Sequence, residues 1–368
     1  MTYHVGRMRV PDISVRKKEH LDLAAGVDAA STSTPGWDDV HLLAASIPRI
    51  ALADVDLSVE LLGHRIEAPF VIAAMTGGHD EAVAINENLA VTAEELKVAI
   101  GSGSQRAALR HPELARTYSI IRESAPNAVV LANIGIFQLI DQVDSPALTQ
   151  AEIETAVGML DAQFLVVHLN ALEEAIQPEG DSRAAGLIDA LAELTSVSPV
   201  PVIAKETGAG MTRETAGALV QAGISMIDVG GAGGTSFARI EGQRAAMRGD
   251  MVRARLGKSF SGWGIPTASS ILEVVPVGLP VIATGGIRNG IHAAKALRLG
   301  ATAVGVAGPM LKAALDGPEA AKRELSAFVD ELRLATHLSG CVDLVELAEQ
   351  QTILTGHTRA WAEQRGLI

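Results

Sequence analysis

Aromatic residues and cysteines are scarce in this chain. Phe, Tyr and Trp make up 3% of its 368 residues, and Cys341 is its single cysteine. Hydrophobic residues nevertheless reach 48%, so aliphatic side chains must fill the core, as they do in parallel strands buried on both faces. One cysteine excludes an internal disulfide framework and a cysteine metal cluster. We interpret Cys341 as an inert packed thiol.

Long apolar runs and an excess of positive charge are also missing. No apolar run reaches about 18 residues, the length that predicts a membrane span, and residues 1–10 lack the apolar centre of a signal peptide. We therefore expect a cytoplasmic protein. The formal net charge is −13, which argues against nucleic acid and anionic membranes as partners. An anionic substrate would need a locally basic pocket.

Short apolar segments alternate with helical patterns eight times. The expected strands are 69–74, 98–101, 128–132, 164–167, 201–204, 226–229, 280–284 and 303–306. This count predicts an α/β fold, a (β/α)₈ TIM barrel, rather than a doubly wound sheet. We expect three parts: an N-terminal arm and capping segment (1–68), the barrel (69–340), and a C-terminal helical tail that packs on the barrel (341–368).

Two segments interrupt the alternation. Residues 51–62 alternate in a way that predicts a hairpin capping the barrel, and residues 230–265 form the longest break, after the sixth strand. The second segment carries many charges of both signs. Because loops this long in compact domains are usually functional or disordered, we predict a mobile lid there.

Glycine turns follow the last three expected strands. Gly230, Gly231, Gly233 and Gly234 follow the sixth strand, and residues 285–286 and 307–308 follow the seventh and eighth. Glycine lets the backbone approach a ligand closely, and such turns often cradle phosphate through N–H groups. A flexible linker is the alternative for the first turn. Three consecutive turns predict loops that converge on one anionic ligand.

Polar residues end most of the expected strands. In TIM barrels the active site lies at this end of the strands, although polar residues there also cap helices. The candidates are Thr76, Ser104, Arg106, Asn133, His168, Asn170, Lys205, Asp228, Thr235 and Arg288. His168 and Asn170 lie two apart and so share one face, which favours a ligand contact. Lys205 either stabilises negative charge on a cofactor ring or pairs with Asp228.

Two charged clusters lie outside the strands. Glu173, Glu174 and Glu179 follow the fourth strand; they are either a solvated acidic loop or a site for Mg²⁺, which prefers oxygen ligands and often bridges to phosphates. The segment 16–20 is basic, and it is either a solvated helix start or an arm that closes over an anion.

Several of these strings, in this order, resemble the type 2 isopentenyl diphosphate isomerases, which are FMN-dependent (β/α)₈ barrels. The resemblance covers residues 16–367. Its strings are Arg16-Lys17 with His20, and residues 75–78, 104–109, 168–170, 178–180, 205–208, 230–236, 263–267 and 285–290.

The resemblance implies FMN, Mg²⁺ and NAD(P)H as flavin reductant, a prenyl diphosphate substrate and a homo-oligomer (tetramer or octamer). The residues implied for the FMN phosphate are Gly285, Gly286, Arg288, Ala307 and Gly308. Those implied for the flavin ring and ribityl chain are Ala74, Met75, Thr76, Ser104, Asn133, Lys205 and Thr235. Those implied for the substrate are Arg16, Lys17, His20, Arg106, His168 and Asn170, with Glu174 as the Mg²⁺ ligand.

The reaction implied is isomerisation of isopentenyl diphosphate to dimethylallyl diphosphate by acid/base chemistry of reduced flavin. We expect His168, Lys205 and Glu173 as catalytic residues, the last because of a departure from the family. The chain departs from the family at Glu173, where relatives have glutamine, and at Gly308, where many have arginine. Since a carboxyl group can carry a proton, Glu173 could itself act as an acid or base. The departure at Glu173 also leaves two other functions open: a related flavoenzyme that acts on a modified prenyl diphosphate, or a net-redox FMN oxidoreductase.

Overall fold

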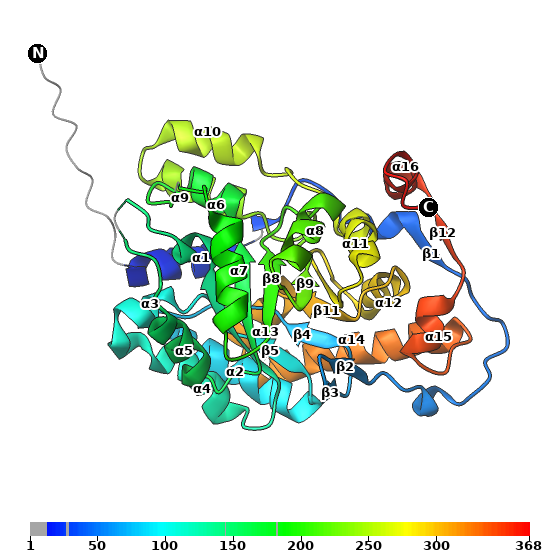
Figure 1. The fold of residues 1–368 in the computed structure, drawn as a ribbon. Helices are drawn as coiled ribbons and strands as arrows, with labels where there is room; N and C mark the ends of the chain where they lie inside the picture. The colour runs from blue at the N-terminus through cyan, green and yellow to red at the C-terminus, as the bar shows by residue number, and fades with distance from the viewer. Residues whose placement is uncertain (1–12, 27–28, 144, 182) are drawn as a thin grey trace, which may run out of the picture.

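A computed structural model describes residues 13–26, 29–143, 145–181 and 183–368. Its centre is a closed barrel of eight parallel strands (Figure 1), so the predicted TIM barrel is confirmed. In chain order these strands are β4 (Phe70–Ile72), β5 (Ala99–Gly101), β6 (Val130–Gly135), β7 (Phe164–Leu169), β8 (Val202–Glu206), β9 (Met226–Asp228), β10 (Val281–Thr284) and β11 (Ala303–Val306).

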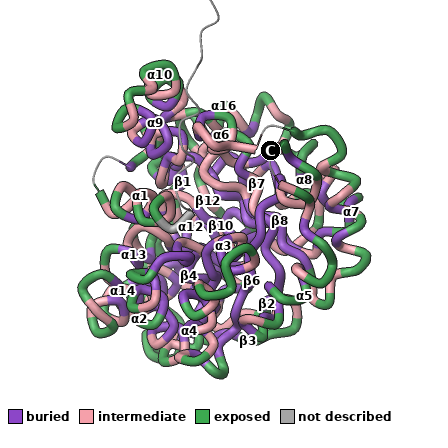
Figure 2. Tube along the Cα trace, turned by 90° about the vertical axis from the view of Figure 1, so that its left-hand side faces the viewer, coloured by how far each residue is buried: buried purple, intermediate pink, exposed green. Residues whose placement is uncertain are grey.

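Eight helices surround the barrel and alternate with its strands. They are α2 (Glu81–Leu96), α4 (Arg116–Ser124), α5 (Gln150–Met159), α7 (Leu187–Val197), α8 (Arg213–Gln221), α11 (Thr267–Val274), α12 (Gly290–Arg298) and α14 (Pro318–Leu338). Figure 2 shows the strands buried at the centre and the outer faces of the helices exposed. Aliphatic residues of strands and helices form the main core between the two layers, as the scarcity of aromatic residues requires.

A hairpin closes one end of the barrel. It consists of β2 (Val59–Leu61) and β3 (His64–Ile66), and Leu61 and Ile66 pack in one cluster with barrel residues such as Val71 and Ile203. The predicted capping hairpin therefore exists, but it lies later than residues 51–62. The reason is the turn at Leu62 and Gly63, which have φ of 46° and 87°, whereas residues upstream form the short 3₁₀ helix η3 (Leu52–Asp54).

The segment after β9 is not an irregular lid. It folds into α9 (Phe237–Met247) and α10 (Met251–Ser259), which lie side by side at the top of Figure 1. Gly242 and Gly257 allow this contact, because a Cβ on Gly257 would lie 2.4 Å from the Cα of Gly242. The charge pattern was misleading because several of these charges, including Arg244, are buried in ion pairs.

Several short elements were not predicted. Three helices begin directly after strands or strand-end turns: α3 (Arg106–Arg110), α6 (Ala171–Ile176) and α13 (Gly308–Leu315). The C-terminal tail holds the helices α15 (Leu344–Glu349) and α16 (Gly356–Gln364), but also β12 (Thr352–Leu354), which pairs antiparallel with β1 (Val40–Leu42). The remaining elements are α1 (Ile13–Ala25), η2 (Trp37–Asp39), η4 (Pro112–Leu114), η5 (Ile136–Leu139) and η6 (Val275–Val277). Among the described residues, no helix is long and apolar enough to span a membrane.

Candidate active site

A cavity of about 970 Å³ opens where the barrel strands end. All the residues expected to bind flavin line it: Ala74, Met75, Thr76, Ser104, Asn133, Lys205, Thr235, Gly285, Gly286, Arg288, Ala307 and Gly308. Lys17, His20, His168 and Glu173 line it too. The polar strand ends therefore meet in one place, as the position of active sites in TIM barrels predicts.

One end of the cavity is built to hold an anion. Gly285 and Gly286 have φ of 127° and 67°, a conformation that side chains other than glycine rarely adopt. Ala307 and Gly308 stand at the N-terminus of α13, where N–H groups and the helix dipole favour negative charge. A Cβ on Gly308 would meet no atom within 4 Å, so the approach to these N–H groups is open. This donor set fits the phosphate of FMN.

The glycines after β9 pack tightly on neighbouring backbone. A Cβ on Gly230 would lie 2.0 Å from the carbonyl oxygen of Glu206, and one on Gly231 would lie 2.4 Å from the Cα of Thr267. These glycines let the turn pack tightly on its neighbours. The turn is thus packed rather than a flexible linker, and Gly230, Gly231 and Gly234 line the same cavity as the other two glycine turns.

Lys205 presents a buried positive charge to the middle of the cavity. Its side chain is 9% exposed, and Nζ donates a hydrogen bond of 2.8 Å to the carbonyl oxygen of Glu206. The alternative pairing with Asp228 is not formed, since the Asp228 carboxylate accepts hydrogen bonds from Thr284 Oγ1 (2.9 Å) and from the N–H of Gly230 (3.2 Å). Lys205 therefore lines the cavity without pairing with Asp228.

His168 is held in one orientation by Asn133. The amide nitrogen of Asn133 donates to the carbonyl oxygen of Ser102, so its Oδ1 accepts, and Nδ1–H of His168 donates to it over 2.8 Å. This network assigns the neutral tautomer with an unprotonated Nε2. Burial, reinforced by the nearby Lys205, lowers the pKa of His168 to about 3. His168 is thus a neutral group at neutral pH.

The acidic residues after β7 lie in two separate places. Nδ2 of Asn170 donates to Glu173 Oε2 (3.1 Å) and to Glu174 Oε1 (2.9 Å), and Glu174 also accepts from the N–H of Asp181 (2.8 Å). Burial and the neighbouring Glu173 raise the pKa of Glu174 to about 7. Glu179 lies apart from this pair, because it forms an ion pair with Arg244 (2.6 Å).

The basic residues expected to hold the substrate are also divided. Lys17 and His20 of α1 reach the cavity, whereas Arg16 and Arg106 do not line it. Arg106 forms an ion pair with Asp181 (2.8 Å) and donates to Ser145 Oγ (3.0 Å). Burial and the neighbouring Arg16 lower the pKa of Lys17 to about 8. Lys17 is therefore the cation of the N-terminal arm that directly faces this space.

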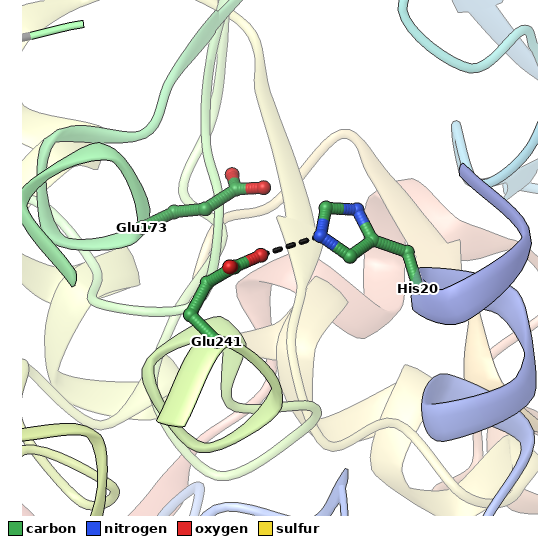
Figure 3. A group of neighbouring side chains, drawn as sticks. All are labelled: His20, Glu173 and Glu241. Atoms are coloured by element: carbon green, nitrogen blue, oxygen red, sulfur yellow. Dashed lines mark hydrogen bonds and ion pairs between the residues drawn. The ribbon is translucent and has the colours of Figure 1, made fainter. Parts of the chain in front are cut away.

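Glu241 was not predicted to belong to this region. Figure 3 shows it hydrogen-bonded to His20, with the carboxylate of Glu173 facing the pair. Ligand atoms of the three residues lie within 4.8 Å of one another, so they could also share a metal ion. Burial lowers the pKa of His20 to about 3 and raises that of Glu241 to about 7. At neutral pH His20 is thus neutral and contributes hydrogen bonding rather than charge.

Glu206 was also overlooked, although it follows Lys205 directly. It lines the same cavity, and burial raises its pKa to about 7. The available signal was its position at the carboxyl end of β8, where a buried strand meets the site. Glu241 gave no such signal, because it lies in a charged segment whose helical packing only the structure reveals.

Sequence comparison places this barrel among known enzymes. A protein of Methanosarcina mazei named isopentenyl-diphosphate delta-isomerase is 46% identical over 355 residues, covering 96% of this chain and 95% of the relative. The protein of that name from Methanopyrus kandleri is 42% identical, covering 96% of this chain and 95% of the relative. The chain belongs to the isopentenyl-diphosphate delta-isomerase family.

Broader comparisons agree with this family of enzymes. The family of FMN-dependent dehydrogenases matches residues 149–354. Among solved structures, a mandelate oxidase with benzoyl-formic acid has a TM-score of 0.61 at 19% identity, covering 91% of this chain and 94% of its own. A flavocytochrome b2 has a TM-score of 0.65 at 17% identity, covering 91% of this chain and 83% of its own. At such low identity these two structures support the barrel fold alone.

Proposed function

We propose that this isomerase-family enzyme converts isopentenyl diphosphate to dimethylallyl diphosphate, with FMN and Mg²⁺. The observation that carries the proposal is the continuous cavity, which joins the anion-binding turn at Gly285 and Gly286 to Lys17 and His20 of α1. One end suits a flavin phosphate, and the other suits a second anionic group. The names of the relatives supply the prenyl diphosphate as that second group.

The residues that line the cavity suit FMN. Arg288 and the N–H groups of residues 307–308 would hold its phosphate, and Lys205 would stabilise negative charge on its ring. Reduced FMN supplies a ring proton beside the alkene when it is bound, and NAD(P)H would supply the electrons that first reduce it. The residues implied for the ribityl chain and ring are all buried or half-buried in the cavity wall.

The diphosphate would bind near Lys17 and His20, with Glu174 as the Mg²⁺ ligand. Glu174 lies beside Glu173, and the two carboxyl groups share the amide of Asn170. A divalent cation would offset their repulsion and also bind phosphate oxygens. Arg16, Arg106 and Asn170 would support this end from behind the cavity wall. We also propose a homo-oligomer.

Isomerisation requires one proton to be added and another to be removed from the allylic unit. Glu173 lines the cavity and points toward His20 and Glu241 (Figure 3), so we assign it the role of acid/base at the allylic carbon. His168, with Nε2 unprotonated, would accept a hydrogen bond and orient the substrate. The same Glu173 favours the second candidate, a flavoenzyme that acts on a modified prenyl diphosphate or carries out net redox chemistry.

Product analysis distinguishes these functions. Isopentenyl diphosphate is incubated with holoprotein, Mg²⁺ and enough NADPH to reduce the flavin once. An isomerase should form many equivalents of dimethylallyl diphosphate per enzyme without further NADPH consumption, and a chelator of Mg²⁺ should stop it. Consumption of one NADPH per product would establish the redox alternative, and an unchanged substrate would refute the proposed isomerisation.

Replacing Arg288 with alanine is expected to weaken FMN binding about tenfold, because a charge-assisted hydrogen bond to phosphate contributes about 1.5 kcal/mol. Nη2 of Arg288 already bonds the carbonyl oxygen of Gly233 at 3.0 Å, which keeps the guanidinium at the phosphate end. Flavin fluorescence would give the dissociation constants of FMN from the wild type and from the variant. Riboflavin, which lacks the phosphate, should bind the variant and the wild type equally; an equal loss for both flavins would contradict the assignment.

A further inference from the structure

The peptide groups of the turn after β10 are held from behind by two side chains. The carbonyl oxygen of Gly286 accepts a hydrogen bond from the indole Nε1–H of Trp37 (3.1 Å), and that of Gly285 accepts one from the hydroxyl of Thr267 (2.9 Å). Trp37 is 2% exposed and Thr267 is 0% exposed. Gly285 and Gly286 line the main cavity, followed by Ile287, whereas the two side chains do not. The two carbonyl groups therefore point away from the cavity.

This arrangement decides where the neighbouring N–H groups point. In a trans peptide the carbonyl oxygen and the following N–H point in opposite directions, and the described part of the chain contains no cis peptide bond. The carbonyl of Gly285 shares its peptide group with the N–H of Gly286, and the carbonyl of Gly286 shares its own with the N–H of Ile287. Both N–H groups therefore point to the cavity side of the turn. Successive N–H groups aimed at one space form an anion-binding concavity.

Trp37 is itself fixed by contacts with α12. Its ring stacks on His292, with the ring centroids 6.0 Å apart and the planes 28° from parallel. Its carbonyl oxygen accepts a hydrogen bond from Nζ of Lys295 (2.7 Å). His292 also accepts from the N–H of Arg288 (3.3 Å), two residues beyond Gly286. The indole N–H is thus held in one direction, toward the turn.

The segment that carries Trp37 packs against both glycine turns at this end of the cavity. A Cβ on Gly286 would lie 2.8 Å from the Cβ of Pro35, and one on Gly233 would lie 2.2 Å from the nitrogen of Pro35. The N–H of Ala268 donates to the carbonyl oxygen of Pro35 (2.9 Å), which fixes the segment to the start of α11. This part of the N-terminal region therefore forms the back of the phosphate end.

We propose that Trp37 and Thr267 are positioning residues for the phosphate of FMN. Because glycine adopts many backbone conformations, the peptide groups of Gly285 and Gly286 would not keep their direction by themselves. The two side chains hold the carbonyl groups back and thereby aim the N–H groups of Gly286 and Ile287 at the phosphate. Donors that are already oriented bind an anion without first having to reorganise. The inference rests on FMN as the bound cofactor, and both side chains act through the backbone.

Replacing Trp37 with phenylalanine keeps a ring that can stack on His292 but removes the N–H donor. The dissociation constant of FMN should rise about fivefold, the usual effect of losing one neutral hydrogen bond, while riboflavin, which lacks the phosphate, should bind the variant and the wild type equally. Trp361→Phe provides a matched control. It removes an indole N–H that donates to Glu273 in the C-terminal region (2.8 Å), so neither flavin should bind differently.

Thr267 allows the hydrogen bond to be separated from side-chain shape. Thr267→Val preserves the shape and removes the hydroxyl, and FMN should again bind about fivefold more weakly. The same hydroxyl lies 3.2 Å from the carbonyl oxygen of Ala232, so valine also loosens the turn after β9. Thr267→Ser keeps the hydroxyl and should bind FMN as the wild type does. A serine variant as weak as the valine variant would show that packing, not the hydrogen bond, matters.

A measurement on the wild type covers the case in which these variants do not fold. Amide hydrogen exchange of residues 285–288 is followed by mass spectrometry with FMN and with riboflavin bound at saturation. The N–H groups of Gly286 and Ile287 donate to the phosphate in this proposal, so FMN should slow their exchange more than riboflavin does. Equal protection by the two flavins would contradict the proposed direction of the N–H groups.

The remaining outcomes separate this inference from the proposed function. Unchanged FMN affinity in both Trp37→Phe and Thr267→Val, or an equal loss for FMN and riboflavin, would overturn the positioning role. A wild type that binds FMN no more tightly than riboflavin would overturn the phosphate site together with this inference. If the flavin affinities change as expected but isopentenyl diphosphate is not converted, the positioning role stands and only the proposed isomerisation is refuted.

Discussion

Replacing Arg244 with alanine is expected to lower the free energy of unfolding by about 3–5 kcal/mol, the usual effect of removing one partner from buried ion pairs. Its side chain is 0% exposed and contacts Glu19 of α1 (3.0 Å), Glu179 after α6 (2.6 Å) and Glu241 of α9 (2.5 Å). The variant would leave Glu241 without its arginine, while Glu19 and Glu179 would keep only their pairing with Arg248 (2.7 and 3.5 Å). Chemical denaturation followed by circular dichroism would measure the change.

Arg253 supplies the matched control for Arg244. It pairs with Asp250 at 2.9 Å within the same pair of helices, but its side chain is 40% exposed. Exposed ion pairs contribute about 0–1 kcal/mol, so Arg253→Ala should change the stability little. Equal effects of the two substitutions would show that burial of the Arg244 cluster does not stabilise the fold. Arg244→Ala should also increase proteolysis near α1, which would lose its contact through Glu19.

The barrel itself was predictable from the sequence. Strands such as 164–167 and 201–204 consist of consecutive apolar residues because helices cover one face and the barrel interior covers the other, and this pattern repeats with regular spacing. The polar residues at their ends, such as His168 and Lys205, then had to converge, since all eight strands are parallel. Their shared cavity follows from the topology without any knowledge of side-chain contacts.

Contacts between distant segments could not be predicted in this way. His20 meets Glu241 across 221 positions in the chain, and this contact depends on how α1 and α9 pack on each other. Arg106 was expected to face the substrate because it follows a strand, but it starts α3 and turns toward Asp181. Local periodicity specifies which element forms; it does not specify the direction of a long side chain at the end of that element.

Lys17 is expected to control the binding of the diphosphate, and Lys17→Met should weaken it about 10- to 150-fold at pH 7, in line with about 1.5–3 kcal/mol for hydrogen bonds to charged groups. Lys17 lines the cavity. Lys18, the next residue, is exposed and pairs with Asp22 (3.2 Å) and Glu81 (3.0 Å). Lys18→Met should therefore change the dissociation constant by less than about threefold.

The pH dependence gives the charge of Lys17 a direct test. Its pKa of about 8 means that the ammonium is protonated below pH 8 and loses its proton as the pH rises. The last ionisation of a phosphate group lies near pH 6, so the charge of the ligand is constant in this range. Calorimetric titration with isopentenyl diphosphate should therefore show affinity falling by up to about tenfold per pH unit above pH 8. Lys17→Arg keeps its charge, since arginine stays protonated, and should give a flat profile; the same decline in that variant would assign the ionisation to another group.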